Sequence, residues 1–575
     1  MRGFNERAFL EVSRPPLKDE GDEWLKRAED SIEFLKLNAR SDEIVIYGIA
    51  SAALIHGVLA PTAQVTPADH KDLLNSCIFP DDCWRIERAW GGGHGHRIYL
   101  DPPLSSPRCT SLVGGEPLIF RRSFSGVDKG PAPVELSQKL VHSLDLYHVE
   151  ERSAYCRLDR HGDIEDVIRV IQLKEQPDGD CDVVVTILAA DLARYATLAD
   201  MCLVLKFDFT RYGNDFDGWD QMTQREVIEP DLFYNTGLAT NASYANGCMI
   251  MRSSFTVEDL IQVWKDEDDP DKKEYATFKI IDRKNKALVE TSCAPEYLSN
   301  YFEESDLPWE ISPAFFKPEV LHRFKSDPEK YDLQDRSITC RGTWHLKSYD
   351  INEEGQVHAY IGDLRHLPFE EQRYWQSFNE WPKGTISKRA FENDILGEFS
   401  SEYDPLAALK YKIRQLDETP PAWWKRRGEE LHNAARYPAT DSVSEWADEI
   451  LALDQLLVEG FLTKPLQVLL REAGREIDPQ WKPLRLLQDY LEAKGTTPED
   501  ARETLSPLAK LHSLRNPLKG HGSTSERSAA QKQARAEHGT LRAHYTDLAS
   551  QCDAALNAIL TALGSTIDLG TWAYK

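Results

Sequence analysis

The sequence predicts a multidomain protein in which a mixed α/β (α+β) region is followed by an all-α helical bundle. Three observations point to this fold class. The chain has 575 residues, several times the ~150 residues of a typical domain. Short β-branched runs separated by turn residues recur between about 115 and 350. From residue 446 onwards, apolar residues recur at the spacing of amphipathic helices.

The first 60 residues predict a helix, a strand and a second helix. Residues 18–40 place apolar side chains at helical spacing, and the run 43–47 is typical of a strand. The stretch 50–59 is mostly apolar, and we expect it to be helical.

The middle of the chain is expected to form a sheet-containing body. The β-branched runs are interrupted by turn residues such as Pro177-Asp-Gly-Asp180. An aromatic-rich stretch from Trp344 to Phe399 is expected to complete the body, because aromatic residues at such spacings usually belong to a core. The predicted strands are 166–171, 182–187, 202–207 and 278–281.

The last part of the chain is expected to be helical throughout. Thr419-Pro420-Pro421 opposes both helices and inner strands, so we place a domain boundary between 415 and 440. Thr497 and Pro498 have the residue types that begin helices. The predicted helices are 446–457, 466–473, 484–491, 498–515 and 541–563.

These patterns divide the chain into four parts. They are an N-terminal α/β segment (1–120), a mixed α/β sensor or regulatory domain (121–415), a linker (416–440) and a helical domain (441–575).

Charge is distributed unevenly along the chain. The formal net charge is −27, and residues 1–420 contain 49 basic and 74 acidic side chains. The segment from Arg502 to Arg542 is the exception, with eight basic and three acidic residues. An acidic protein is a poor general binder of nucleic acid, because phosphate contacts need Lys and Arg. The basic segment is therefore the expected place for such a contact, although many charge runs are only solvated helix faces.

Cysteine usage and hydropathy predict a cytoplasmic protein. The ten cysteines are scattered without C-x-x-C pairs, as expected for reduced thiols. The N-terminus lacks the apolar middle segment of a signal peptide, and no apolar run approaches the ~18 residues needed to span a bilayer. We therefore expect no membrane partner.

One motif in the basic segment has the residue types of a catalytic site. Arg515-Asn516-Pro517 and His521 lie between two predicted helices. Pro517 disfavours helical geometry at Asn516, so we expect the helix to end there and Arg515 and His521 to flank a turn. The alternative is that Arg515 only ends a helix and that His521 has no role beyond the turn.

An arginine, a polar asparagine, four further residues and a histidine, late in a bundle of about five helices, resemble the motif of the HEPN superfamily of ribonucleases. The resemblance covers the last quarter of the chain. It implies a HEPN-like helical bundle and a metal-independent endoribonuclease without cofactor, with Arg515, Asn516 and His521 as site residues. It also implies a homodimer, since HEPN enzymes are similar in joining two such sets across a two-fold axis.

The chemistry is consistent with these residue types. RNA can be cut when its 2′-hydroxyl attacks the adjacent phosphorus, which requires proton transfer and a cation for the phosphoryl oxygens. His521 can exchange a proton near neutral pH, and Arg515 can bind phosphate through two hydrogen bonds. Asn516 would orient either group, and Lys519 and Arg527 would position the RNA backbone. The expected products end in a 2′,3′-cyclic phosphate.

The resemblance to HEPN toxins and abortive-infection proteins implies a role in anti-phage defence. The N-terminal region would then detect an unknown trigger, a phage component or a small molecule, and the helical domain would cut RNA.

Two alternatives assign the function elsewhere. The helical bundle could be a non-catalytic dimerisation or partner-binding module attached to an N-terminal enzyme or metal-binding domain. In that region His94 and His96 could bind a metal, with His70 or Asp101 as a further ligand. Asp163 and Lys174 faintly resemble the site of metal-dependent nucleases, although a glutamine, Gln172, stands at the position of the second acidic ligand.

Overall fold

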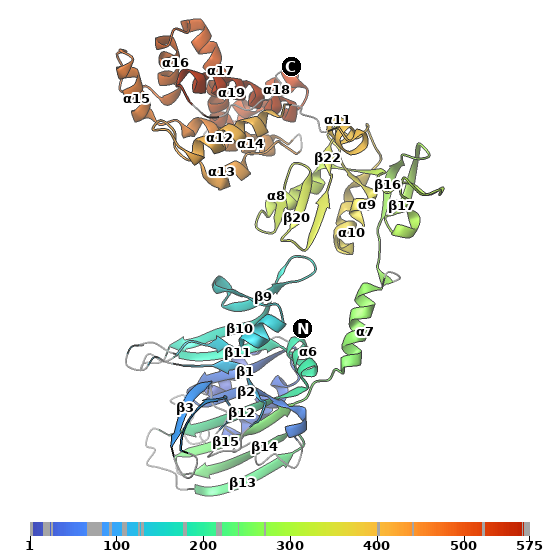
Figure 1. The fold of residues 1–575 in the computed structure, drawn as a ribbon, viewed down its shortest axis with the longest axis vertical. Helices are drawn as coiled ribbons and strands as arrows, with labels where there is room; N and C mark the ends of the chain where they lie inside the picture. The colour runs from blue at the N-terminus through green and yellow to red at the C-terminus, as the bar shows by residue number, and fades with distance from the viewer. Residues whose placement is uncertain are drawn as a thin grey trace. The chain divides into compact units, whose positions relative to one another are not determined.

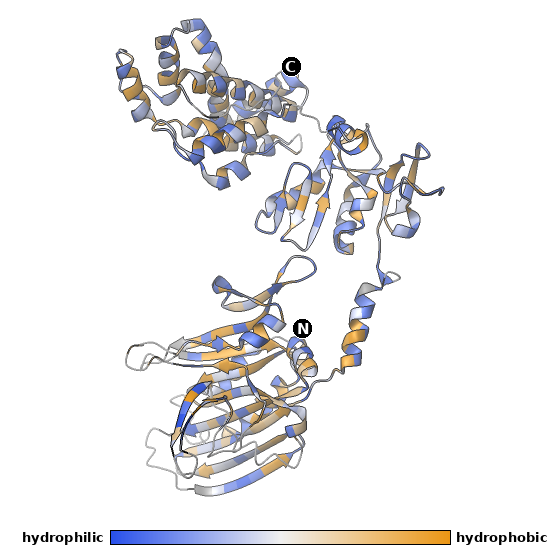
Figure 2. Ribbon diagram, viewed as in Figure 1, coloured by the Kyte–Doolittle hydropathy of each residue, from blue (hydrophilic) through white to orange (hydrophobic). Residues whose placement is uncertain are grey.

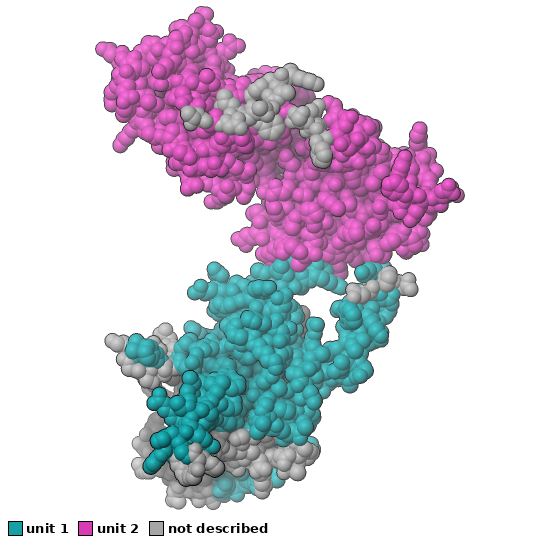
Figure 3. Space-filling view, viewed as in Figure 1, with its two compact units in different colours: residues 1–273 teal, residues 274–575 magenta. Residues whose placement is uncertain are grey.

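The computed structural model divides into two compact units, residues 1–273 and 274–575, coloured separately in Figure 3. The residues described are 4–14, 24, 27–65, 83–90, 95–105, 112–122, 124, 127, 132–175, 181–213, 221–239, 241–269, 272–398, 403–439, 442–519, 524–565 and 567. Within these ranges, none of the helices combines the length and the apolar character that crossing a bilayer would require.

Unit 1 is built on an eleven-stranded antiparallel sheet. Its strand order is β13-β14-β15-β12-β2-β1-β11-β10-β9-β8, and β5 pairs with β2. The strands are β1 (Glu43–Ala50), β2 (Ala53–Pro61), β5 (Glu116–Pro117), β8 (Tyr147–Val149), β9 (Ala154–Leu158), β10 (Ile164–Glu175), β11 (Cys181–Leu188), β12 (Met201–Tyr212), β13 (Gln221–Glu229), β14 (Leu232–Ala239) and β15 (Ala242–Met251).

Hydrophobic side chains of the central strands form the main core of unit 1. Figure 2 shows apolar residues concentrated in these strands. The core also takes up apolar residues of the surrounding helices, including Phe9, Leu35 and Leu192. The helices of the unit are α1 (Glu6–Ser13), α3 (Ser31–Asn38), α5 (Gln138–Ser143), α6 (Ala189–Ala199) and α7 (Val257–Asp268). A separate hairpin consists of β3 (Arg85–Trp90) and β4 (His96–Asp101).

Two expectations for this half of the chain were wrong. The stretch 50–59 forms most of β2 rather than a helix, because it pairs with β1 on one side and β12 on the other. The boundary expected at residue 120 falls inside unit 1, since the sheet joins strands from residue 43 to residue 251. The predicted strands at 166–171, 182–187 and 202–207 are present, within β10, β11 and β12.

Unit 2 begins with an α/β part around a six-stranded sheet of order β17-β16-β18-β23-β22, with β24 paired to β18. A second sheet has the order β19-β20-β21. The strands are β16 (Thr277–Asp282), β17 (Ala287–Ser292), β18 (Pro313–Phe316), β19 (Tyr331–Leu333), β20 (Ser337–Cys340), β21 (Trp344–Lys347), β22 (Asp350–Ile351), β23 (Val357–Tyr360) and β24 (Asn379–Glu380). The helices are α8 (His322–Ser326), α9 (Ile361–Leu364), α10 (Phe369–Phe378) and α11 (Lys388–Ala390).

The second part of unit 2 is a helical bundle, red to orange in Figure 1. Its core is formed by the apolar stripes of the helices, with Trp446 and Tyr545 among its largest fully buried side chains. The helices are α12 (Pro405–Glu418), α13 (Gly428–Ala434), α14 (Val443–Leu457), α15 (Thr463–Glu472), α16 (Pro483–Ala493), α17 (Pro498–Lys519), α18 (Thr524–His538) and α19 (Leu541–Ala562). The sequence-based order, a sheet-rich region before a helical one, is confirmed.

The segment 416–440 is not a linker, contrary to expectation. Trp423 and Trp424 are buried in the bundle core, and the indole N–H of Trp424 donates to Asp417 Oδ1 at 2.9 Å. The prolines after Thr419 only end α12, which itself packs against α19. The helical part therefore starts near Pro405, earlier than the predicted residue 441.

Candidate functional site

Helix α17 carries the first residue of the predicted motif. As expected, Thr497 caps the helix: its Oγ1 accepts from the Asp500 N–H at 3.2 Å, and its hydroxyl donates to Asp500 Oδ2 at 2.7 Å. Leu508 and Leu511 are buried in the bundle core and hold the helix in place. His512 and Arg515 are three positions apart and are therefore neighbours on one face of the helix.

The sequence predicts that this helix ends at Asn516, and this prediction is wrong. The helix continues through Pro517 to Lys519. A proline in the last turn costs one backbone hydrogen bond, and Leu518 is buried in the bundle core, which favours completing the turn. Arg515 therefore lies on a helix face rather than beside a turn.

A buried carboxylate of α14 lies opposite this face. Asp454 has no exposed surface, and its Oδ1 lies 3.0 Å from Nδ1 of His512. Its Oδ2 accepts from Nη1 of Arg515 at 3.3 Å. The same Nη1 also donates to Glu459, just beyond the end of α14. We call these four residues, Asp454, Glu459, His512 and Arg515, the Arg515 cluster.

Both hydrogen bonds from Arg515 to these carboxylates are donated by one guanidinium nitrogen, Nη1. The hydrogen bond to Glu459 raises the pKa of Arg515, although desolvation opposes the shift. Within the described part of the chain, Nε and Nη2 make no hydrogen bond, and about a third of the side chain is exposed. These two nitrogens form the edge that binds a phosphate or carboxylate through parallel hydrogen bonds. The arginine is thus oriented by carboxylates while one pair of donors remains available.

His512 is oriented by the same carboxylate. Because a carboxylate only accepts hydrogen bonds, the Nδ1 of His512 is the donor in its contact with Asp454. Half of the His512 side chain is exposed. The cluster therefore combines a fixed cation with a half-exposed imidazole. Sequence reasoning missed His512, although its spacing from Arg515 on a predicted helix was an available signal.

The other predicted site residues are only partly described. Asn516 and Lys519 lie in the last turn of α17, and their side chains are outside the description. His521 lies outside the described residues. Arg527 is on α18 and is half-buried. The structure thus brings Arg515 together with acidic partners that the motif did not include.

Among the described residues of unit 1, the candidates form no comparable centre. His96 is on β4, where its ring stacks on Trp90, while His70 and His94 lie outside the described residues. Asp101, at the end of β4, accepts a hydrogen bond from Ser105. Within the described ranges, no group of three or more His, Cys, Asp or Glu side chains could hold a metal ion.

Asp163 and Lys174, suggested as parts of one nuclease site, are separated by the length of a strand. Asp163 directly precedes β10, and Lys174 is at the far end of that strand. At about 3.3 Å per residue, the two backbone positions are more than about 30 Å apart. They do not belong to one site.

Comparison with known proteins gives no relative: no family model, no curated protein and no solved structure matches the chain.

Proposed function

We propose that the helical part of unit 2 is a HEPN-like, metal-independent endoribonuclease that acts as a homodimer. The observation that carries the proposal is the hydrogen bonding of the Arg515 guanidinium. Its Nη1 is held by Asp454 and Glu459, while the edge formed by Nε and Nη2 makes no hydrogen bond with the described residues. A cation fixed in this way suits a phosphodiester, because its orientation costs nothing further when the substrate binds.

The proposed reaction is transesterification within the RNA. The 2′-oxygen bonds to phosphorus, the bond to the 5′-oxygen breaks, and the products end in a 2′,3′-cyclic phosphate and a 5′-hydroxyl. His521 takes the proton of the 2′-hydroxyl, and Arg515 stabilises the charge on the phosphoryl oxygens. Asn516 orients the histidine or the phosphate, and Lys519 and Arg527 bind neighbouring phosphates.

The second proton transfer, to the leaving 5′-oxygen, is assigned to His521 of a second copy of the chain. This is why the proposal includes a homodimer. Light scattering should show a dimer at micromolar concentration, and a monomer that still cuts RNA would contradict this part of the proposal. If His512→Gln abolishes cleavage by such a monomer, His512 is the second group.

The direct test of the motif is His521→Ala in the full-length protein. Cleavage should fall by about 100- to 10,000-fold, the usual cost of removing an acid-base group, while circular dichroism and the dimer stay unchanged. Lys519→Ala should weaken RNA binding and its salt dependence without abolishing turnover. A folded His521→Ala protein that cuts at the wild-type rate would rule out this residue.

In cells, the proposed role is that of a toxin or abortive-infection effector, with the N-terminal region as the sensor of a trigger. Expression of the wild-type chain should then slow bacterial growth, and His521→Ala should relieve the effect. Equal toxicity of both proteins would contradict the role.

The same contacts are compatible with one competing function. The ion pairs from Arg515 to Asp454 and Glu459 join two segments of the bundle, and they would have this structural role in a non-catalytic binding module as well. Salt separates the two functions. RNA affinity at a phosphate site falls steeply as salt rises, whereas an apolar partner surface responds weakly.

A further inference from the structure

A second cationic centre lies in unit 2, at a cavity of about 550 Å³. One wall belongs to the α/β part and includes Arg336 and Tyr349. The other belongs to the helical part and includes Lys410 of α12, Arg436 after α13 and Arg542 of α19. We call this space the Lys410 cavity. Its volume is in the range of small-molecule sites, about 300–1,000 Å³.

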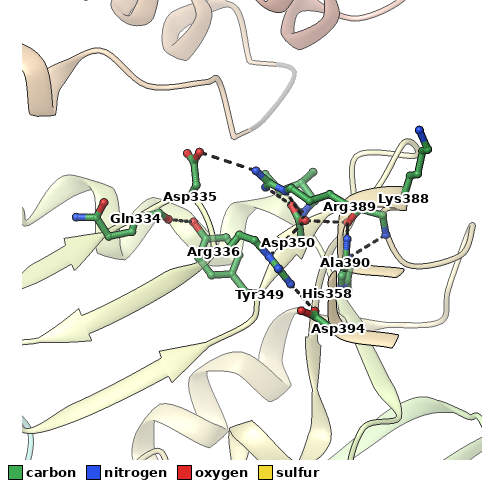
Figure 4. A network of polar contacts seen from close by, with 12 residues as sticks. Gln334, Asp335, Arg336, Tyr349, Asp350, His358, Lys388, Arg389, Ala390 and Asp394 are labelled. Atoms are coloured by element: carbon green, nitrogen blue, oxygen red, sulfur yellow. Dashed lines mark hydrogen bonds and ion pairs between the residues drawn. The ribbon is translucent and has the colours of Figure 1, made fainter. Parts of the chain in front are cut away.

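Charges on the α/β wall are neutralised within the protein. Figure 4 shows Arg336 paired with Asp394, and Arg389 paired with Asp350. The second pair is bidentate, with Nε and Nη2 of Arg389 donating at 3.0 and 2.7 Å. Burial would raise the pKa of Asp350, but Arg389 outweighs it and the pKa is lowered. The arginines of this network are therefore paired with carboxylates of the same part of the chain.

The helical wall is different. Lys410 makes no hydrogen bond or ion pair with the described residues. Arg436 uses its Nε to donate to the carbonyl of Asn433, and Arg542 donates to the carbonyl of Pro438 and lies over the ring of Tyr437. Among the described residues, none of these three cations has a carboxylate as ion-pair partner.

The acidic residues that line the cavity, Asp335 and Asp404, are fewer than its cations and compensate them only in part. Asp404 already accepts hydrogen bonds from the Ala407 N–H and the Tyr437 hydroxyl, each at 2.8 Å. Asp335 lies 3.9 Å from Arg389, on the opposite wall. Lys325 also lines the cavity, but its ammonium pairs with two carboxylates of α14. A positive excess therefore remains on the helical wall.

The local field affects Lys410 itself. Burial lowers its pKa, and the charges of Arg436 and Arg414 lower it further, while Asp335 and Glu449 oppose the shift. Partial burial of several cations without counter-charges is unfavourable unless an anion joins them. A bound anion would raise the pKa of Lys410 and would supply the missing counter-charge to the neighbouring cations.

We propose that the Lys410 cavity binds a nucleotide-sized molecule with two or more phosphate groups. Three cations from three separate segments can contact several phosphate oxygens at once. The remaining volume accommodates an organic group beside Tyr411 and Tyr437, two aromatic residues that line the cavity. The inference concerns a free ligand and does not depend on RNA cleavage at the Arg515 cluster.

Isothermal titration calorimetry of the full-length protein tests this site with ATP, pyrophosphate and adenosine as probes. ATP and pyrophosphate should bind, and adenosine should not, because the cations recognise phosphate. Equal affinity for ATP and adenosine would overturn the proposal. So would binding of a single-stranded RNA 12-mer without binding of ATP, which would make the wall an RNA contact.

Variants locate the binding. Lys410→Met should weaken ATP binding by about 10- to 100-fold, as expected for a lost hydrogen bond to a charged group, and Arg436→Gln should act in the same direction. Lys410→Arg should retain binding. The matched control is Lys464→Met, on the exposed surface of α15. Unchanged affinity in folded Lys410→Met and Arg436→Gln proteins, or an equal loss in Lys464→Met, would overturn the assignment.

Discussion

The Arg515 cluster and the Lys410 cavity both contain cationic side chains, but they differ in whether carboxylates pair with these cations. At the cluster, two carboxylates hold one nitrogen of Arg515. At the cavity, Lys410, Arg436 and Arg542 have no carboxylate partner among the described residues. A cation held by carboxylates has a fixed direction, which suits a bond-breaking step, whereas cations without carboxylates favour uptake of a mobile anion.

Helix α12 contains the same contrast within two residues. Lys412 is fully buried, and its Nζ lies 2.6 Å from Oδ1 of the fully buried Asp553. The Tyr403 hydroxyl donates to the other oxygen of Asp553 at 2.8 Å. Lys410, half a turn away, is on the cavity wall with no such partner. The charge of Lys412 therefore stabilises the bundle core, whereas the charge of Lys410 is available to a ligand in the cavity.

The largest effect is expected where Arg515 loses its charge. Arg515→Ala should lower the rate of RNA cleavage by about 100- to 10,000-fold, as for other groups that stabilise developing charge. Arg502→Ala, an exposed arginine on the same helix, is the matched control and should cut normally. Equal rates for the two variants would remove the distinction between the cluster and an ordinary basic surface.

A buried charge without its partner should be nearly as costly. Lys412→Ala removes the ion-pair partner of the buried Asp553, so the unfolding free energy should fall by about 3–5 kcal/mol. Lys410→Met, on the same helix, should leave it unchanged or raise it, since a half-buried charge is removed. Urea unfolding measures both. Similar losses in the two variants would mean that the two sides of α12 do not differ.

A smaller effect is expected when the cluster keeps its shape but loses a carboxylate. Asp454→Asn should lower kcat by about 10- to 100-fold, because Arg515 and His512 each lose a charge-assisted hydrogen bond. KM should change less, since other phosphates still bind. Asp448→Asn, an exposed position on α14, is the control. A change in KM alone would contradict a positioning role for Asp454.

Buried histidines should make the stability of both units depend on pH. Burial lowers the pKa of His544 to about 4 and that of His56 to about 3. Below the ordinary value of about 6.5, the unfolded chain binds protons that the folded chain excludes. Stability should therefore fall as the pH drops from 6.5 towards 4, by up to about 1.4 kcal/mol per pH unit for each histidine.

Unfolding measured at several pH values checks this expectation. His544→Gln should flatten the slope for the bundle even if it lowers overall stability. An unchanged slope would show that His544 is not held neutral in the folded state.

The helices of the bundle were easier to predict than strand β2, because these helices are buried on one side and the strand is buried on both. The α14 and α19 stripes are apolar on one side only, so their period is visible in the sequence. Strand β2 is buried on both sides, so apolar and polar residues do not alternate and the stretch was mistaken for a helix. Helix α12 was missed because the prolines that end it looked like the end of a domain.

The candidate site was predicted in part. The residue types of the motif singled out Arg515, but its partner Asp454 is 61 positions away and no local pattern links the two. The expected helix end at Asn516 followed the local preference of Pro517, which the burial of Leu518 overrides. The Lys410 cavity unites segments spread over more than two hundred residues, so only folding could reveal it.

The central claim is that the Arg515 cluster belongs to a site that cuts RNA through its own 2′-hydroxyl. The most direct measurement is cleavage, in EDTA, of one RNA and of the same RNA with a single 2′-deoxynucleotide at the cut position. We expect the first to be cut to a 2′,3′-cyclic phosphate and the second to remain intact at that position. Cleavage of both, or strict dependence on a divalent metal ion, would contradict the claim.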